Sequence, residues 1–135
     1  EDVRTFPDGS MIAAGGTIVV AITSTGFEST FGFKPDFEVL ESDPAIPNLI
    51  DDPNWGDPAT FLQLGNSGDE VILRGPDSRV VDILVYGNGS FPGTPACELV
   101  EWPNHSLERF PFWRDRDNCP LDFRDWAFPN PGQLP

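Results

Sequence analysis

A single histidine limits the acid–base chemistry open to this chain. His105 is the only histidine in the 135 residues, and Ser106 follows it directly. A serine–histidine relay would therefore have one possible base, immediately beside its nucleophile. We interpret His105 instead as a surface imidazole at the start of a strand. Neither a G-x-S-x-G element nor a phosphate-binding loop occurs. The sequence therefore offers no candidate catalytic residue, and we expect that the chain is not an enzyme.

Carboxylates are abundant, because 22 acidic residues stand against eight basic ones and give a net charge of −14. Abundance alone brings some acid pair close together, so it does not indicate a glycosidase-like site. So acidic a surface repels phosphates, which argues against nucleic acid and anionic membranes as partners. No run of 18 apolar residues occurs, and we therefore expect no membrane insertion.

One stretch near the end of the chain carries the oxygen ligands that calcium prefers, at alternating positions. The candidate ligands are Asp115, Asp117, Asn118 and Asp122, with Asp125 beyond them. Three neighbouring arginines support a second interpretation, in which they neutralise these acids by ion pairing; they are Arg114, Arg116 and Arg124. The central glycine and terminal glutamate of an EF-hand are missing. Calcium, here or in the acidic stretch 41–58, is the one cofactor that the sequence admits.

The two cysteines, Cys97 and Cys119, lie 22 residues apart in loop-like surroundings. No C-x-x-C motif or companion histidine indicates zinc, so the sequence predicts a disulfide. Such a bridge would restrict the unfolded chain by about 3 kcal/mol, and it is typical of oxidising compartments. Glycosylation-type triplets at Asn88 and Asn104 fit a secreted chain. We expect an extracellular or cell-surface protein.

Prolines and glycines interrupt the whole chain. There are 15 Pro and 13 Gly, and the longest stretch free of both is the ten residues 77–86. Long helices are therefore excluded, and the apolar runs read as strands, at 17–23, 60–64, 70–74 and 79–86. Turn residues at 65–68 and 75–78 predict an antiparallel meander over 60–86. Residues 41–58 are expected to form an acidic surface loop.

One helical turn is expected near residue 25. Thr25 and Glu28 have the spacing of a capping box, and Phe27 and Phe31 lie four residues apart on one helix face. Gly32 can end the turn in a left-handed conformation. The sequence thus predicts an all-β protein with long loops and at most one or two short helical turns.

Several stretches, taken in order, resemble the lamin-tail domain, an immunoglobulin-like family found in nuclear lamins and in exported prokaryotic proteins. The most specific is 64–73, similar to the family's N-x-G-D-E-V-x-L signature, with support from 6–10, 12–20, 106–109 and 129–132. The motif residues are Asn66, Gly68, Asp69, Glu70, Asp82, Ser106, Glu108 and Arg109. The resemblance spans about residues 6–132 and implies a single immunoglobulin-like antiparallel β-sandwich over 1–135.

The chain departs from the family pattern in two places. Asn104 stands where the family has glycine, and asparagine tolerates a left-handed backbone best after glycine. The family's opening strands are missing, because residues 1–5 are too short to replace them. We expect the open sheet position to be filled by a strand from another polypeptide or from an upstream segment. Asp69 and Asp82 are expected to bond turn amides or to pair with Arg109.

These features favour a non-catalytic extracellular module for protein interaction or assembly, by self-association or strand complementation. Aromatic residues crowd the segment 102–128, and those left exposed would form a contact face. The alternative is an accessory domain of a larger secreted hydrolase, nuclease- or phosphodiesterase-like, whose catalytic part lies outside this chain. A lamin-like nuclear role is opposed by the disulfide, the acidity and the absence of coiled-coil heptads.

Overall fold

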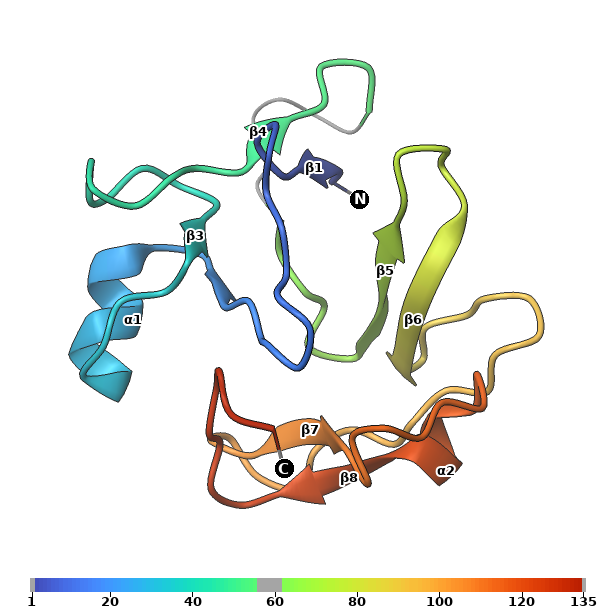
Figure 1. Cartoon of the computed structure of the whole chain (residues 1–135). Coiled ribbons are helices and arrows are strands. Elements are labelled where there is room, and N and C mark those ends of the chain that lie inside the picture. The colour runs from blue at the N-terminus through green and yellow to red at the C-terminus, as the bar shows by residue number, and fades with distance from the viewer. Residues whose placement is uncertain (1, 56–61, 135) are drawn as a thin grey trace. The chain divides into compact units, whose positions relative to one another are not determined.

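The computed structural model describes residues 2–55 and 62–134 (Figure 1). The chain forms two compact units, 1–63 and 64–135. Strands account for 28% and helices for 9% of the structure, which confirms the all-β class. Each sheet has two strands, so an immunoglobulin-like sandwich remains a prediction.

The described part of the first unit contains two short strand pairs and one helix. Its elements are β1 (Arg4–Thr5), β2 (Val20–Ala21), α1 (Ser24–Phe31), β3 (Phe37–Glu38) and β4 (Ile50–Asp51). β1 pairs antiparallel with β4, whereas β2 pairs in parallel with β3. The parallel pair departs from the expected all-antiparallel arrangement, and α1 supplies the crossover that such a pair requires. The buried hydrophobic residues in the described part of the first unit are Val19, Val39 and Leu49.

Helix α1 confirms the expected end but not the expected start. Gly32 caps the helix with φ 78°, and its N–H donates to Glu28 at 2.8 Å. At the other end the N-cap is Thr23, whose side chain makes no capping hydrogen bond, so the predicted capping box at Thr25 is wrong. A carboxylate distant in sequence takes over, because Ser24 N–H donates to Glu38 Oε2 at 2.7 Å.

Glu38 is fully buried at the centre of the first unit. Its carboxylate accepts hydrogen bonds from Ser24 N–H, from Ser42 N–H at 3.0 Å, from the Ser42 hydroxyl at 2.5 Å and from Asp43 N–H at 3.0 Å. Burial alone would raise the pKa of Glu38, but these four donors outweigh it and lower the pKa to about 2. The charged side chain therefore ties α1, β3 and the following loop together.

The second unit is built on a hairpin. Its elements are β5 (Gly68–Arg74), β6 (Val80–Gly87), β7 (Ser106–Arg109), α2 (Cys119–Asp122) and β8 (Phe123–Trp126). β5 pairs antiparallel with β6, and β7 with β8. In the turn between β5 and β6, Asp77 Oδ1 accepts the N–H of Arg79 at 3.1 Å, as expected for residues 75–78. The buried hydrophobic residues are Ile83, Val85, Cys97 and Cys119.

Two expected strands differ from the structure. The apolar run 17–23 forms only β2, although backbone bonds from 36–40 accompany residues 19–22. Residues 62–64 are not in a strand, and residues 60 and 61 lie outside the described residues. The meander is thus reduced to the β5–β6 hairpin, because residues 65–67 lead into β5 without a preceding strand at 62–64. The described part of the 41–58 loop contains β4 and the buried Leu49, so it is anchored rather than purely a surface loop.

Candidate functional site

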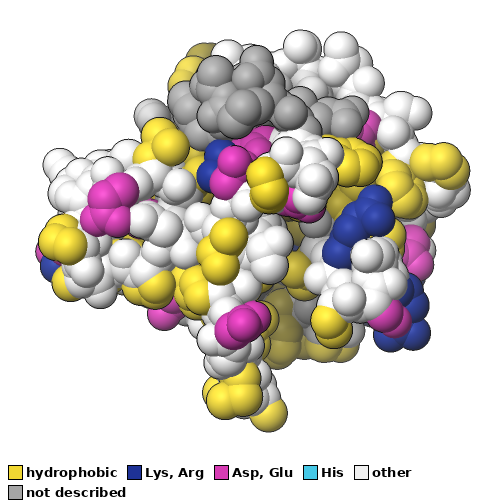
Figure 2. Space-filling view, turned by 90° about the horizontal axis from the view of Figure 1, so that it is seen from above, with side chains coloured by type: hydrophobic (Ala, Val, Ile, Leu, Met, Phe, Trp, Pro, Cys, Tyr) yellow, Lys and Arg dark blue, Asp and Glu magenta, His cyan; other side chains and the backbone are white. Residues whose placement is uncertain are grey.

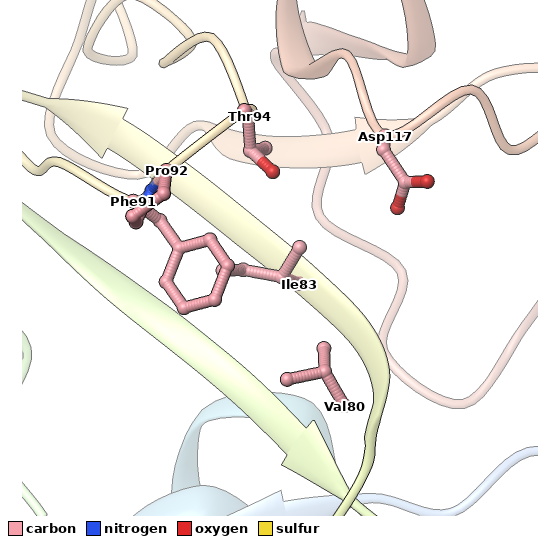
Figure 3. Close-up of a pocket in the computed structure, with 7 residues that line it drawn as sticks. Val80, Ile83, Phe91, Pro92, Thr94 and Asp117 are labelled. Carbon is pink, nitrogen blue, oxygen red and sulfur yellow. The ribbon is translucent and has the colours of Figure 1, made fainter.

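A pocket of about 350 Å³ lies against β6 in the second unit (Figure 3). Its lining residues are Val80, Ile83, Phe91, Pro92, Gly93, Thr94 and Asp117. They come from β6, from the loop that follows it and from the segment before α2. Ile83 is buried, whereas Asp117 is exposed. The pocket is therefore apolar against the sheet and open to solvent at its acidic side.

A proline–glycine turn builds one wall of the pocket. Thr94 N–H donates to Phe91 O at 3.2 Å, which closes a four-residue turn with Pro92 and Gly93 in the middle. Gly93 has φ 86°, the positive value that the third position of such a turn requires and that glycine adopts without strain. The turn brings the Phe91 ring and the Thr94 hydroxyl to the same pocket.

The disulfide links the two walls. Cys97 and Cys119 are bonded, with Cα atoms 5.0 Å apart, which confirms the predicted pair. Cys97 follows the Phe91–Thr94 turn and bonds to β6, because its N–H donates to Val85 O at 2.8 Å. Cys119 follows Asp117 by two residues. The bridge therefore holds the turn and Asp117 together over β6.

Ion pairs neutralise most of the acids beside the pocket. Arg109 Nη2 donates to Asp82 at 2.6 and 2.8 Å, and Arg109 Nη1 lies 2.8 Å from Asp115. Arg116 Nε donates to the buried Asp122 at 2.7 Å. The expected pairing of Asp82 with Arg109 is confirmed.

These contacts shift the pKa values of the side chains so that the charged forms are favoured. Burial lowers the pKa of Arg109, but Asp115 and Asp82 outweigh it and raise the pKa. The Asp117 N–H and the Arg109 guanidinium lower the pKa of Asp115. Burial raises the pKa of Asp122, yet its bonds to Arg116 dominate and the pKa falls. Asp115 and Asp122 are therefore more readily ionised than an unpaired aspartate.

Most of the residues predicted as calcium ligands take part in other hydrogen bonds or ion pairs. Asp115 and Asp122 accept hydrogen bonds from arginine side chains, and Asn118 donates its N–H to Asp122 at 3.3 Å. Within residues 2–55 and 62–134, no group of three His, Cys, Asp or Glu side chains lies as a metal ion requires. Of the three arginines expected to neutralise these acids, Arg116 does so at Asp122. Asp115 is paired by Arg109 instead, and Arg124 lies over aromatic rings. In the other candidate stretch, Asp57 lies outside the described residues.

Asp69 and Asp82 each cap an amide in their own strand. Asp69 Oδ1 accepts the N–H of Glu70 at 2.9 Å, and Asp82 Oδ1 accepts the N–H of Ile83 at 2.8 Å. Asp69 Oδ2 also accepts the N–H of Gly65 at 2.9 Å, which confirms the expected bond to a turn amide. The two acidic motif residues thus satisfy backbone groups of the hairpin.

The turn before β5 contains Asn66, and Gly68 opens the strand. Gly68 has φ 143°, and a Cβ atom there would collide with the backbone of Tyr86 and Asn88. The glycine of the motif is therefore required by close approach of the two strands.

Among the described residues of the second unit, strand β5 pairs with β6 on one side and with no strand on its outer edge. Val85 O and Gly87 N bond with Cys97, so both residues direct their peptide groups away from β5. Because this direction alternates along paired strands, Glu70 and Ile72 direct theirs away from β6. The N–H of Glu70 is capped, but among the described residues the backbone groups of Ile72 have no partner.

The β7–β8 pair holds the remaining motif residues. Ser106 donates its hydroxyl to Glu108 Oε1 at 3.0 Å, so Ser106 does not contact the histidine as a nucleophile would. His105 Nδ1 instead lies 2.9 Å from both oxygens of Asp125, and this contact lowers the pKa of Asp125. The imidazole is a half-buried bridge between the two strands.

Aromatic side chains remain exposed over the end of the chain. The most exposed are Trp102 at 65%, Trp113 at 72% and Phe128 at 78%. Arg124 lies between two further rings, 3.5 Å from the centroid of Phe110 and 4.2 Å from that of Trp126. Figure 2 shows another face, seen from above the view of Figure 1, where hydrophobic side chains also lie at the surface near acidic ones. The expectation that part of the aromatic cluster stays exposed is confirmed.

Both glycosylation triplets lie at the surface. Asn88 and Asn104 are exposed, and both positions can be reached from solvent. Asn104 has φ 104°, which confirms the expected positive φ where the family has glycine. No helix within the described ranges has the length and apolar character needed to cross a membrane.

Sequence reasoning missed the pocket and the buried Glu38. The Pro-Gly pair at 92–93 was the available signal for the pocket wall, whereas Glu38 resembles any surface acid in sequence. In the comparisons with known proteins, no family model, curated protein or solved structure matches this chain. The lamin-tail resemblance therefore rests on its motifs alone.

Proposed function

We propose that the chain is a non-catalytic extracellular module that works by contact, and that two copies join through the free edge of β5. The observation that supports this is the backbone of Ile72, which has no hydrogen-bond partner among residues 2–55 and 62–134 and lies on a strand with exposed apolar side chains. An open edge is a template for another strand. Pairing there would extend the β5–β6 hairpin toward an immunoglobulin-like sandwich.

The sequence of β5 is self-complementary in one antiparallel register. With Ile72 opposite Ile72 of the second copy, Glu70 of each copy lies opposite Arg74 of the other. In the same register Val71 faces Leu73, and these side chains are 41% and 42% exposed in the single chain. Two ion pairs and six apolar side chains, Val71, Ile72 and Leu73 of each copy, would then line the contact. Opposite-charge pairs across strands stabilise such registers.

The contact is expected to be weak. Asp69 caps the N–H of Glu70 in the single chain, so pairing exchanges one hydrogen bond for another at that position. Each copy also carries a charge of −14, although salt at about 0.15 M screens this repulsion beyond about 8 Å.

Light scattering coupled to size exclusion tests the proposal, from about 10 µM to about 1 mM, the range in which small interfaces associate. We expect a concentration-dependent dimer that Ile72→Pro abolishes. The N–H of Ile72 points away from β6, so its loss leaves the hairpin bonds intact. A wild-type chain that stays monomeric throughout this range contradicts the proposal.

A charge exchange tests the register. Glu70→Arg and Arg74→Glu each place like charges opposite one another in a homodimer, so neither variant is expected to associate alone. Mixed in equal amounts, they restore both ion pairs and should form the heterodimer. A mixture that behaves as two monomers excludes this register.

A further inference from the structure

The pocket on β6 is amphipathic. In Figure 3, Val80, Ile83 and the Phe91 ring lie together, and the Asp117 carboxylate stands across the opening from them. Thr94 adds a hydroxyl beside this opening. Such a site suits a ligand with an apolar stem and a polar end.

Among the described acids Asp82, Asp115, Asp117 and Asp122, Asp117 is the one without a cationic partner. Asp82 and Asp115 share Arg109, and Asp122 pairs with Arg116. In the part of the second unit that the structure describes, no ion pair or hydrogen bond engages the Asp117 side chain; only its N–H is used, by Asp115 Oδ1 at 3.2 Å. A cation at Asp117 therefore displaces no existing bond.

Asp117 is also held in position. It has φ 50°, a left-handed backbone that few residues other than glycine adopt. The Asp115 bond before it and the disulfide after it fix this segment beside the Phe91–Thr94 turn. The carboxylate is thus preorganised at the mouth of the pocket.

We propose that this pocket binds a primary alkylammonium group, the lysine side chain of a different protein. The methylene stem packs on Ile83 and Phe91, and the ammonium donates to the Asp117 carboxylate and the Thr94 hydroxyl. A second copy of this chain is a poor source, because Lys34 is its only lysine and already pairs with Asp43 at 2.5 Å. The net charge of −14 favours a basic partner.

The probe is n-butylammonium, titrated into the oxidised, isotope-labelled chain and followed by the amide resonances of Ile83, Thr94 and Asp117. We expect saturable shifts, with n-butanol binding about fivefold more weakly, the effect of one half-exposed ion pair, and with butyrate not binding. Absence of saturable shifts, or equal binding of butyrate or butanol, overturns the proposal.

A matched pair of variants isolates the carboxylate. Asp117→Asn keeps the side-chain shape, and asparagine tolerates the positive φ; it should reduce butylammonium binding to the level of butanol. Asp8→Asn, which changes an exposed carboxylate that does not line the pocket, should leave binding unchanged. Retained binding in Asp117→Asn contradicts the proposal.

Two further probes define the partner. The peptide acetyl-Ala-Lys-Ala-amide must bind at least as tightly as butylammonium; a peptide that does not bind excludes a lysine carried by a protein. Tighter binding of n-propylguanidinium would assign the pocket to arginine and overturn the lysine proposal. Repeating the titration on Ile72→Pro separates this pocket from the β5 edge, because no pocket residue belongs to β5.

Discussion

Glu38 in the first unit and Asp122 in the second are both buried carboxylates that organise a loop, but different donors hold them. Glu38 accepts four hydrogen bonds, all from neutral groups of Ser24, Ser42 and Asp43. Asp122 accepts two bonds from Arg116, one of them charged, and one from Asn118. The Arg116 side chain is 40% exposed, so that bond remains in contact with solvent.

Because the two carboxylates are held differently, we expect the two units to unfold under different conditions. In the first unit, the buried carboxylate of Glu38 is held by neutral donors only, and both cysteines of the disulfide lie in the other unit. The second unit combines an arginine network with the disulfide, and the disulfide lies three residues from Asp122. We therefore expect the first unit to fail in acid and the second to fail on reduction.

Removing the disulfide should have the largest effect. Replacing both Cys97 and Cys119 by serine is expected to destabilise the second unit by about 3 kcal/mol, because the unfolded chain gains freedom. Hydrogen exchange resolved by residue is the measurement. Amides of β5 and β6 should lose protection, whereas those of α1 keep it; equal loss in both units contradicts the comparison.

Glu38→Gln should have the next largest effect, in the first unit. Glutamine has only one acceptor oxygen, so its NH2 group must face either the N–H of Ser24 or the N–H groups of Ser42 and Asp43, and we expect a loss of about 2 kcal/mol. Urea unfolding, followed by exchange of the α1 amides, measures it. Glu28→Gln, a change at an exposed position on the same helix, serves as the control and should leave the free energy of unfolding unchanged. An unchanged free energy of unfolding in Glu38→Gln would contradict the anchoring role of Glu38.

The pH dependence of the same variant follows from the lowered pKa of Glu38. A carboxyl whose pKa is 4.5 when unfolded and about 2 when folded stabilises fully above pH 4.5, and this stabilisation is lost as the pH falls toward 2. The stability difference between wild type and Glu38→Gln should therefore be constant near neutral pH and shrink between pH 4.5 and 2. A difference that grows in acid would contradict the sign.

The smallest effect is expected at Arg116. Arg116→Gln removes a charged bond whose arginine is partly in solvent, and Asp122 keeps the two N–H donors of residues 116 and 118. We expect a loss of about 1 kcal/mol that decreases as salt is raised. Unfolding in low and high salt measures it, and an effect larger than that of Glu38→Gln would reverse the comparison.

Local signals predicted the features that local chemistry controls. The breaker-free run 77–86 became β6, Gly32 ended α1, and the isolated cysteines paired. The apolar run 17–23 shows the limit. It forms a two-residue strand because its partner, β3, is equally short, and nothing within the run reports the length of that partner.

The candidate site was harder to predict, because it joins segments distant in sequence. Motif spacing indicated the pairing of Asp82 with Arg109, 27 residues apart. In contrast, Asp117 lacks a cationic partner because the arginines pair with neighbouring acids instead. Composition does not indicate which acid each arginine pairs with. Glu38 was invisible for the same reason, since its donors lie up to 14 residues away.

Amide hydrogen exchange at Ile72, compared with Leu73 at increasing protein concentration, tests the assembly proposal most directly. The N–H of Leu73 faces Asp82 of β6 and should be protected at every concentration. If a second copy pairs with β5, the amide of Ile72 gains protection as concentration rises. An Ile72 amide that exchanges freely at every concentration would contradict assembly through this edge.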